Sequence, residues 1–138
     1  MSSNNPTFIR PGRTSSSYYY NAIEITKTNN IDGIYTFRSI SSIDTYGCLY
    51  DDYFEPSYSS RNILRCDDDS GGNLQFLISY PIQPGRKYIL IVTTSTLLTN
   101  GSYSIEVAGP SSIYMISVTP GKDIQLSKWN TITMCFSF

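Results

Sequence analysis

The residues best suited to chemistry lie in one acidic run, DDDSGG at residues 67–72. Calcium takes about six to eight oxygen ligands from several chain segments, and successive side chains of an extended chain point to opposite sides. Asp67 and Asp69 could therefore share a face and bind calcium together with Asp44 or Asp51 from a neighbouring strand. A structural turn is the alternative, because aspartates accept backbone hydrogen bonds in turns and glycines supply positive φ. A catalytic carboxylate pair would also need a substrate cleft, for which the expected short turns leave little room.

Histidine is absent from the 138 residues, which excludes several classes of enzyme. Ser-His-Asp and Cys-His catalysis cannot be built from this chain alone, and neither can the usual histidine-containing zinc sites. The 10 basic and 11 acidic residues give a net charge of −1, without a basic stripe that could follow phosphates. We therefore expect neither an enzyme nor a nucleic-acid-binding protein, and no cofactor other than the calcium considered above.

Two of the three cysteines, Cys48 and Cys66, flank one loop between two expected strands. This spacing allows a cross-strand disulfide, in which Tyr50 would face Leu64 if the pairing stays in register. The alternative is three buried free thiols, Cys135 included. No pair of cysteines has C-x-x-C spacing, so a metal or redox motif is not expected.

Short runs rich in Tyr, Ile, Thr and Val, separated by turn residues, predict an all-β protein without a helical stripe. Residues 87–94 form a continuous apolar run, which is typical of a central strand buried on both faces. Residues 73–80 alternate instead, with Leu74, Phe76, Ile78 and Tyr80 on one face. We expect a single antiparallel β-sandwich. Its expected strands are residues 18–26, 33–39, 45–51, 62–66, 73–80, 87–94, 102–109, 113–118 and 130–138.

An ordered set of motifs runs through these strands: D-x-Y-x-x-L-Y at 44–50, the acidic turn at 67–72, x-P-G-x-x-Y-x-x-x-V at 83–92 and G-x-Y-x-x-x-V-x-G-P at 101–110. This order resembles the bacterial pre-peptidase C-terminal (PPC) domain and its animal relatives, which occur as repeats in large secreted proteins. The resemblance covers roughly residues 6–118 and implies a jelly-roll-like β-sandwich, secretion and a non-catalytic binding or structural role. Some relatives bind calcium, collagen or glycans. The chain departs from the pattern because no acidic cluster precedes its first strand, and residues 119–138 have no counterpart.

Both ends extend beyond the domain expected at residues 18–118, as an extended arm at 1–17 and a strand extension at 119–138. Open sheet edges recruit strands from other chains, so we expect the terminal segments to join copies of this chain into a filament or matrix. We expect Pro110 and Pro120-Gly121 to isolate the last 28 residues as a weakly attached extension. The alternatives are ends that fold back onto their own sandwich, and a secreted accessory module that binds a glycan or protein, with or without calcium. The residues expected at the assembly interface are Phe8, Ile9, Trp129, Ile132, Met134 and Phe136.

The resemblance also implies an extracellular location, although Met1 is followed by polar residues rather than by the apolar core of a signal peptide. No apolar run reaches the length of about 18 residues that a membrane-spanning helix needs. The sequence Asn100-Gly101-Ser102 is an N-glycosylation motif in an expected turn. Asn100 is therefore the expected attachment site of a glycan.

Overall fold

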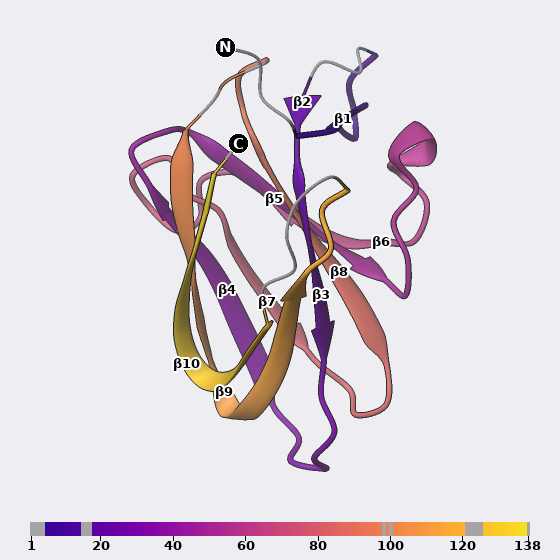
Figure 1. The fold of residues 1–138 in the computed structure, drawn as a ribbon, viewed down its shortest axis with the longest axis vertical. Helices are drawn as coiled ribbons and strands as arrows, with labels where there is room; N and C mark the ends of the chain where they lie inside the picture. Colours follow the sequence, from indigo (N-terminus) through magenta and orange to yellow (C-terminus); the bar gives the residue numbers. More distant parts are fainter. Residues whose placement is uncertain (1–4, 15–17, 98, 100, 121–125, 138) are drawn as a thin grey trace.

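Alternating apolar and polar residues build most of the antiparallel strands, which Figure 1 shows in the computed structural model together with one short helix among the described residues. The structure describes residues 5–14, 18–97, 99 and 101–120, and the backbone alone of residues 126–137. This architecture confirms the predicted all-β antiparallel sandwich. In chain order the elements are β1 (Thr7–Phe8), β2 (Tyr18–Tyr19), β3 (Asn21–Thr26), β4 (Ile34–Ser41), β5 (Thr45–Asp51), the 3-10 helix η1 (Pro56–Tyr58), β6 (Ile63–Asp67), β7 (Leu77–Pro81), β8 (Lys87–Thr94), β9 (Ser102–Ser117) and β10 (Leu126–Ser137).

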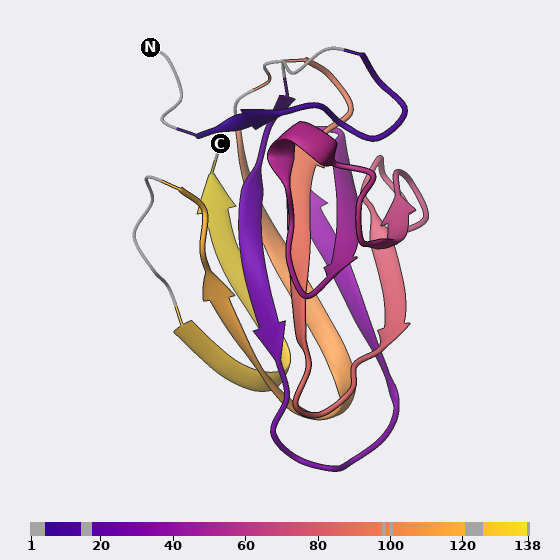
Figure 2. The ribbon, with the colours of Figure 1, turned by 90° about the vertical axis from the view of Figure 1, so that its right-hand side faces the viewer.

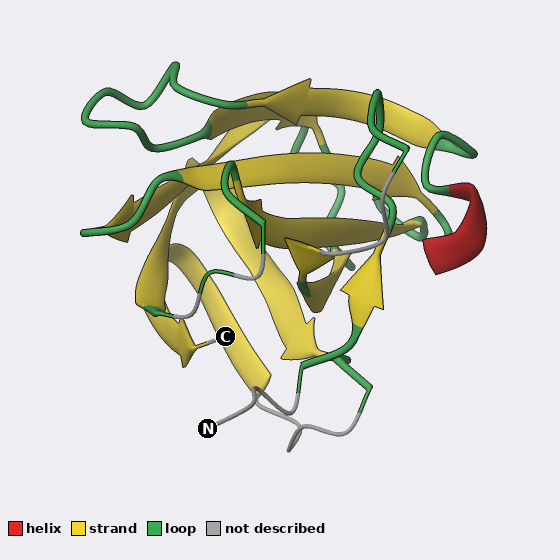
Figure 3. Cartoon of the chain, turned by 90° about the horizontal axis from the view of Figure 1, so that it is seen from above, coloured by secondary structure: helices red, strands yellow, loops and turns green. Residues whose placement is uncertain are grey.

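Apart from β1 and β2, which form a sheet of their own, the described strands form one hydrogen-bonded series in the order β6-β5-β8-β3-β9-β4-β7, with β10 added to β9. The long strand β9 takes part in both layers, because its residues 103–108 pair with β4 and its residues 114–117 pair with β3. β9 and β10 curve together at this change of layer (Figure 1). Seen from above, the strands surround one interior (Figure 3). The same pairing brings the start of β5 beside the ends of β6 and β8, where the acidic turn follows.

β8 is buried on both faces, as its continuous apolar run predicts. Tyr88, Leu90 and Val92 face the interior, whereas Ile89 and Ile91 face a second cluster on the outside of the sheet. Burying one such aliphatic side chain stabilises a fold by about 1.5–3 kcal/mol, so this strand is a main source of stability. The interior core consists of Ile23, Ile25, Tyr35, Phe37, Leu49, Phe76, Ile78, Ile82, Tyr88, Leu90, Val92, Tyr103, Ile105, Val107, Ile113 and Met115.

The N-terminal arm folds back over the outer face of the sheet, where it crosses above η1 (Figure 2). β1 pairs with β2, and Phe8 is only 2% exposed. Its ring packs edge-on against those of Tyr20 and Phe54, at centroid distances of 5.2 and 5.6 Å. The outer cluster, as we call this second group, consists of Phe8, Tyr18, Tyr20, Ala22, Cys48, Tyr50, Ile89 and Ile91, with Tyr46, Phe54, Ile63 and Cys66 packed against it.

The first residues of one expected strand form a turn instead. Asn73 and Leu74 have φ values of 53° and 62°, and β7 begins only at Leu77. Two left-handed residues in succession break the period of two, so the Leu74 side chain is 53% exposed while Phe76 is buried. The prediction that Leu74 lies on one face with Phe76, Ile78 and Tyr80 is therefore wrong for Leu74.

Pro110 does not end the strand that contains it. β9 continues through residues 109–112, which have no ladder partner in the registers with the described strands β3, β4 and β10. Proline's missing N–H therefore costs no ladder hydrogen bond at this point. Gly109 allows a close approach here, because a Cβ atom at this position would lie 2.0 Å from the ring of Tyr35. The two strands expected at 102–109 and 113–118 are thus one bent strand.

Cys48 and Cys66 form the predicted disulfide, with an S–S distance of 2.01 Å. The two residues lie directly opposite each other in the β5–β6 ladder. The register shifts on the far side of the bridge, where Tyr50 lies opposite Ile63 rather than the expected Leu64. A β-bulge of this kind inserts one extra residue into a strand, which the spacing of the cysteines does not reveal.

The C-terminal strand is part of the sheet rather than a weakly attached extension. β10 pairs with β9 from Leu126, opposite Ile116, to Ser137, opposite Ser102. The expectation that Pro110 and Pro120-Gly121 isolate the last 28 residues is therefore wrong, because β9 continues past Pro110 and β10 pairs along β9. Among the described residues, no helix is long and apolar enough to cross a bilayer.

Candidate functional site

Asp67 serves the turn that its sequence context favours. Its Oδ2 atom accepts hydrogen bonds from the backbone N–H groups of Ser70, at 3.0 Å, and of Leu77, at 2.9 Å, and its Oδ1 atom accepts the Ser70 hydroxyl at 2.5 Å. Gly72 follows with a φ of 77°, which glycine adopts without strain. Both carboxylate oxygens of Asp67 are therefore used in holding the turn between β6 and β7.

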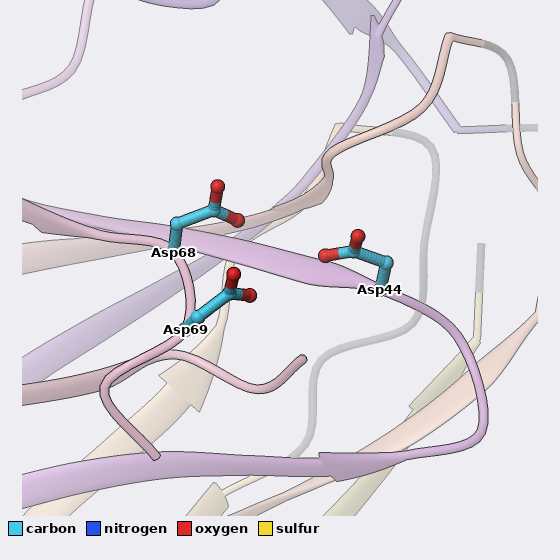
Figure 4. Close-up of side chains that lie close together, drawn as sticks. All are labelled: Asp44, Asp68 and Asp69. Carbon is cyan, nitrogen blue, oxygen red and sulfur yellow. The ribbon is translucent and has the colours of Figure 1, made fainter. Parts of the chain in front are cut away.

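The other carboxylates of this turn meet Asp44, as Figure 4 shows. Asp68 and Asp69 come from the turn after β6, and Asp44 comes from the residue just before β5. One oxygen from each of the three carboxylates lies within 4.8 Å of the others. The structure thus brings together two of the predicted calcium ligands, Asp44 and Asp69, and adds Asp68 in place of Asp67.

Like charges at this distance oppose one another. Partial desolvation, followed by the charges of Asp68 and Asp44, raises the pKa of Asp69 above the ordinary value of 3.8. Asp68 is held by a hydrogen bond from the Ser95 hydroxyl at 2.6 Å, whereas the buried Oδ1 atom of Asp44 has no hydrogen-bond partner among the described residues. A divalent cation would relieve both the repulsion and the unpaired oxygen. Calcium would need further oxygens from water, because these three residues alone do not complete its shell.

A groove of about 260 Å³ lies elsewhere, on the outer face of β3 and β8. It is smaller than the roughly 300–1,000 Å³ of pockets for drug-sized ligands, so it fits a single ring. Its floor is apolar and includes Ala22, Ile89 and Phe54, whose ring is fixed edge-on against Tyr50 at 4.9 Å. The residues that line it are Tyr20, Ala22, Asp52, Tyr53, Phe54, Pro56, Lys87, Ile89, Val118 and Pro120.

The rim of this groove carries an exposed ring beside two opposite charges. Tyr53 is 44% exposed, and the Nζ atom of Lys87 lies 4.0 Å from the Oδ1 atom of Asp52. Asp52 adopts a φ of 68°, which is uncommon for a residue other than glycine, and its N–H donates to the Lys87 carbonyl at 2.8 Å. This backbone conformation turns the chain so that Tyr53 follows directly at the rim. Strained residues of this kind concentrate at functional sites.

The remaining predicted site residues fall into two groups. Phe8 is buried in the outer cluster of its own chain, and Ile9 is half-buried beside it. The side chains of Trp129, Ile132, Met134 and Phe136, expected at the assembly interface, lie outside the described residues, as does Asn100, the expected glycosylation site.

The sequence carries a signal for Asp67 but none for the groove. An aspartate three residues before a serine is typical of a turn that the aspartate side chain caps. This pattern predicts a structural role for Asp67 rather than a role as a metal ligand. Asp52 and Tyr53 stand in an acidic and aromatic loop without any local pattern, and their neighbours Lys87 and Val118 are far away in the chain. No family model, no curated protein and no solved structure matches this chain.

Proposed function

We propose that this chain is a secreted, non-catalytic binding module that takes a sugar ring of a glycan in the groove beside Tyr53. The observation that carries this proposal is a groove with an apolar floor whose rim carries an exposed tyrosine ring, the carboxylate of Asp52 and the ammonium group of Lys87. A sugar presents an apolar face that packs on an aromatic ring, and hydroxyl groups that bind charged side chains. A mostly apolar site with a few placed polar groups is the general form of a small-ligand site.

Two other observations support secretion and a role without catalysis. The Cys48–Cys66 disulfide is of a kind that persists in oxidising compartments. The absence of histidine removes the commonest general base. The resemblance to PPC domains points the same way, since these are secreted binding or structural modules.

Replacing Tyr53 by alanine should weaken glycan binding at least about tenfold, because removing an aromatic ring that packs on the ligand typically has an effect of this size. The purified chain is first screened against immobilised glycans, and the best sugar is then titrated by calorimetry. Tyr58→Ala is the matched control for an uncharged sugar, since Tyr58 is also an exposed tyrosine of the same loop but lies outside the groove. Equal binding by wild type and Tyr53→Ala, or no sugar bound in the screen, would contradict the proposal.

Calcium dependence is the finer part of this proposal, and it rests on the cluster of Asp44, Asp68 and Asp69. Each titration is therefore run with calcium and with a chelator, using wild type and Asp69→Asn. Tighter binding in calcium for the wild type alone supports a calcium site. Identical titrations in the two buffers remove calcium from the proposal and leave the groove unaffected.

Self-association through a terminal strand is the second candidate, as expected of a filament or matrix subunit. It is favoured by one observation: β10 pairs along one edge with β9, and no described strand pairs with its other edge. Long open edges of this kind recruit strands from other chains. The arm is less suited to this role, since Phe8 is buried in its own chain.

We expect the native mass to rise with concentration if this edge joins two copies. Successive N–H groups of a strand point to opposite edges. We therefore compare Ile132→Pro with Thr133→Pro. One of these substitutions removes an N–H group from the outer edge of β10, and the other removes an N–H group that bonds to β9. Sedimentation velocity and thermal unfolding are measured for both. One variant should keep the melting temperature and lose association. A chain that stays monomeric at every concentration would exclude this candidate.

A further inference from the structure

A second hollow, separate from the groove, is lined by cations and hydroxyl groups. It has a volume of about 490 Å³ and lies between the N-terminal arm and the segment that contains η1. The arm contributes Arg10 and Arg13, and the other wall contributes Arg61 with Ser57 and Ser60. No aspartate or glutamate is among its described lining residues. In a chain with a net charge of −1, this is a local concentration of positive charge without its counter-charge.

Both walls of this arginine pocket are fixed by hydrogen bonds. The Ser59 hydroxyl donates to the carbonyl of Ile9, and the Tyr50 hydroxyl donates to the carbonyl of Ser59 at 2.5 Å. On the arm, the Arg13 N–H donates to the Arg10 carbonyl at 3.0 Å and closes a turn. The position of the two walls is therefore set by the fold before any ligand arrives, which reduces the entropy lost on binding.

Arg10 places a permanent charge in the wall itself. It is 5% exposed, and its guanidinium carbon lies 4.6 and 4.3 Å from the ring centres of Tyr18 and Tyr46. One of its nitrogens donates to the Thr94 carbonyl at 2.9 Å, while its buried Nε has no hydrogen-bond partner among the described residues. A buried guanidinium without a carboxylate is costly, and an anion nearby would offset that cost.

Arg13 and Arg61 are exposed and available to a ligand. Neither forms an ion pair within the described part of the chain, whereas Arg38 and Arg86 are paired with Glu106 and Asp51. The Arg61 guanidinium carbon lies 4.9 Å from the centre of the Tyr58 ring, which limits its freedom. Guanidinium groups match the geometry of tetrahedral oxyanions through paired N–H donors.

We propose that the arginine pocket binds an oxyanion group, a sulfate or phosphate monoester, with Arg13 and Arg61 as its direct ligands. Arg10 acts through its fixed charge, and the exposed hydroxyls of Ser57 and Ser60 supply further donors. These contacts join charged groups near the protein surface, and dissolved ions screen such contacts. Binding should therefore weaken as salt increases.

The test is a titration of the labelled full chain, followed by amide NMR, with glucose 6-sulfate, glucose 6-phosphate and glucose. Both esters should shift the amide signals of Gly12, Ser57 and Ser60, and glucose should not. Unequal binding of the two esters identifies which oxyanion the pocket prefers. The double variant Arg13→Gln/Arg61→Gln should bind at least about tenfold more weakly, since a hydrogen bond to a charged group typically contributes this much.

Arg38→Gln is the control, because it removes one arginine charge from β4, at a half-exposed position outside the pocket, where the double variant removes two charges. It should leave the titration unchanged. The proposal is overturned if neither ester shifts those signals at millimolar concentration, if the double variant binds as the wild type does, or if Arg38→Gln weakens binding equally. Tyr53→Ala serves to separate the two sites: it should leave ester binding intact, so failure of the glycan groove does not imply failure of this pocket.

Discussion

Phe8→Ala should lower the free energy of unfolding of the isolated chain by about 3–5 kcal/mol, the usual cost of truncating a buried phenylalanine. Phe8 is 2% exposed and meets Tyr20 and Phe54 edge-on in the outer cluster. Losing it leaves a cavity under the arm, which a two-residue strand such as β1 cannot close by itself. Urea unfolding at a concentration where the chain is monomeric measures the effect.

This variant also separates two roles for the arm. If Phe8 is part of its own core, as its burial indicates, Phe8→Ala destabilises the monomer and Ile9→Ala, which alters a half-buried neighbour, has a smaller effect. If the arm instead joins copies of the chain, Phe8→Ala would leave the unfolding of the monomer unchanged and reduce the sedimenting mass. The two outcomes are exclusive, so one pair of measurements decides where the arm belongs.

Period-two alternation predicted most of the strands because burial imposes it wherever a strand has a core face. β8 was predicted by a different pattern, since its continuous run of apolar residues became a strand buried on both faces. The pattern failed where the backbone, rather than burial, sets the conformation. Leu74 is apolar and correctly spaced, yet it has a left-handed φ and lies exposed in a turn. Pro110 likewise looked like a terminator and lies within a bend of β9.

The candidate sites were harder to predict because each joins segments that the sequence does not connect. The sequence correctly predicted Asp44 and Asp69 as members of the carboxylate cluster. It did not reveal that Asp67 bonds within the turn and that Asp68 is the third member of the cluster. The arginine pocket joins residues 9–13 to residues 57–61. The sequence has no basic stripe because these arginines are far apart along the chain, so it gave no signal for the pocket. The groove beside Tyr53 depends on how the loop after β5 approaches residues 118–120. Long-range packing determines which residues lie together in each site, and local sequence patterns do not predict this packing.

The Cys48→Ala/Cys66→Ala variant should unfold with a free energy about 3 kcal/mol lower than that of the wild type. The bridge joins residues separated by 18 positions and closes a loop that the unfolded chain would otherwise leave free. Chemical unfolding of both proteins without reductant measures the difference. Cys135→Ala is the control, since it removes a cysteine without removing this bridge.

The same loop carries one wall of each proposed site. Residues 49–65 include Asp52 and Tyr53 of the groove, and Ser57 to Arg61 of the arginine pocket. The disulfide therefore fixes the start and end of the segment that both ligands contact, and opening it adds loop freedom that binding must remove again. We expect the double variant, measured at a temperature where it remains folded, to bind sugar and oxyanion more weakly than the wild type. If its unfolding free energy and both affinities equal those of the wild type, the β5–β6 ladder alone positions this loop and the disulfide contributes to neither.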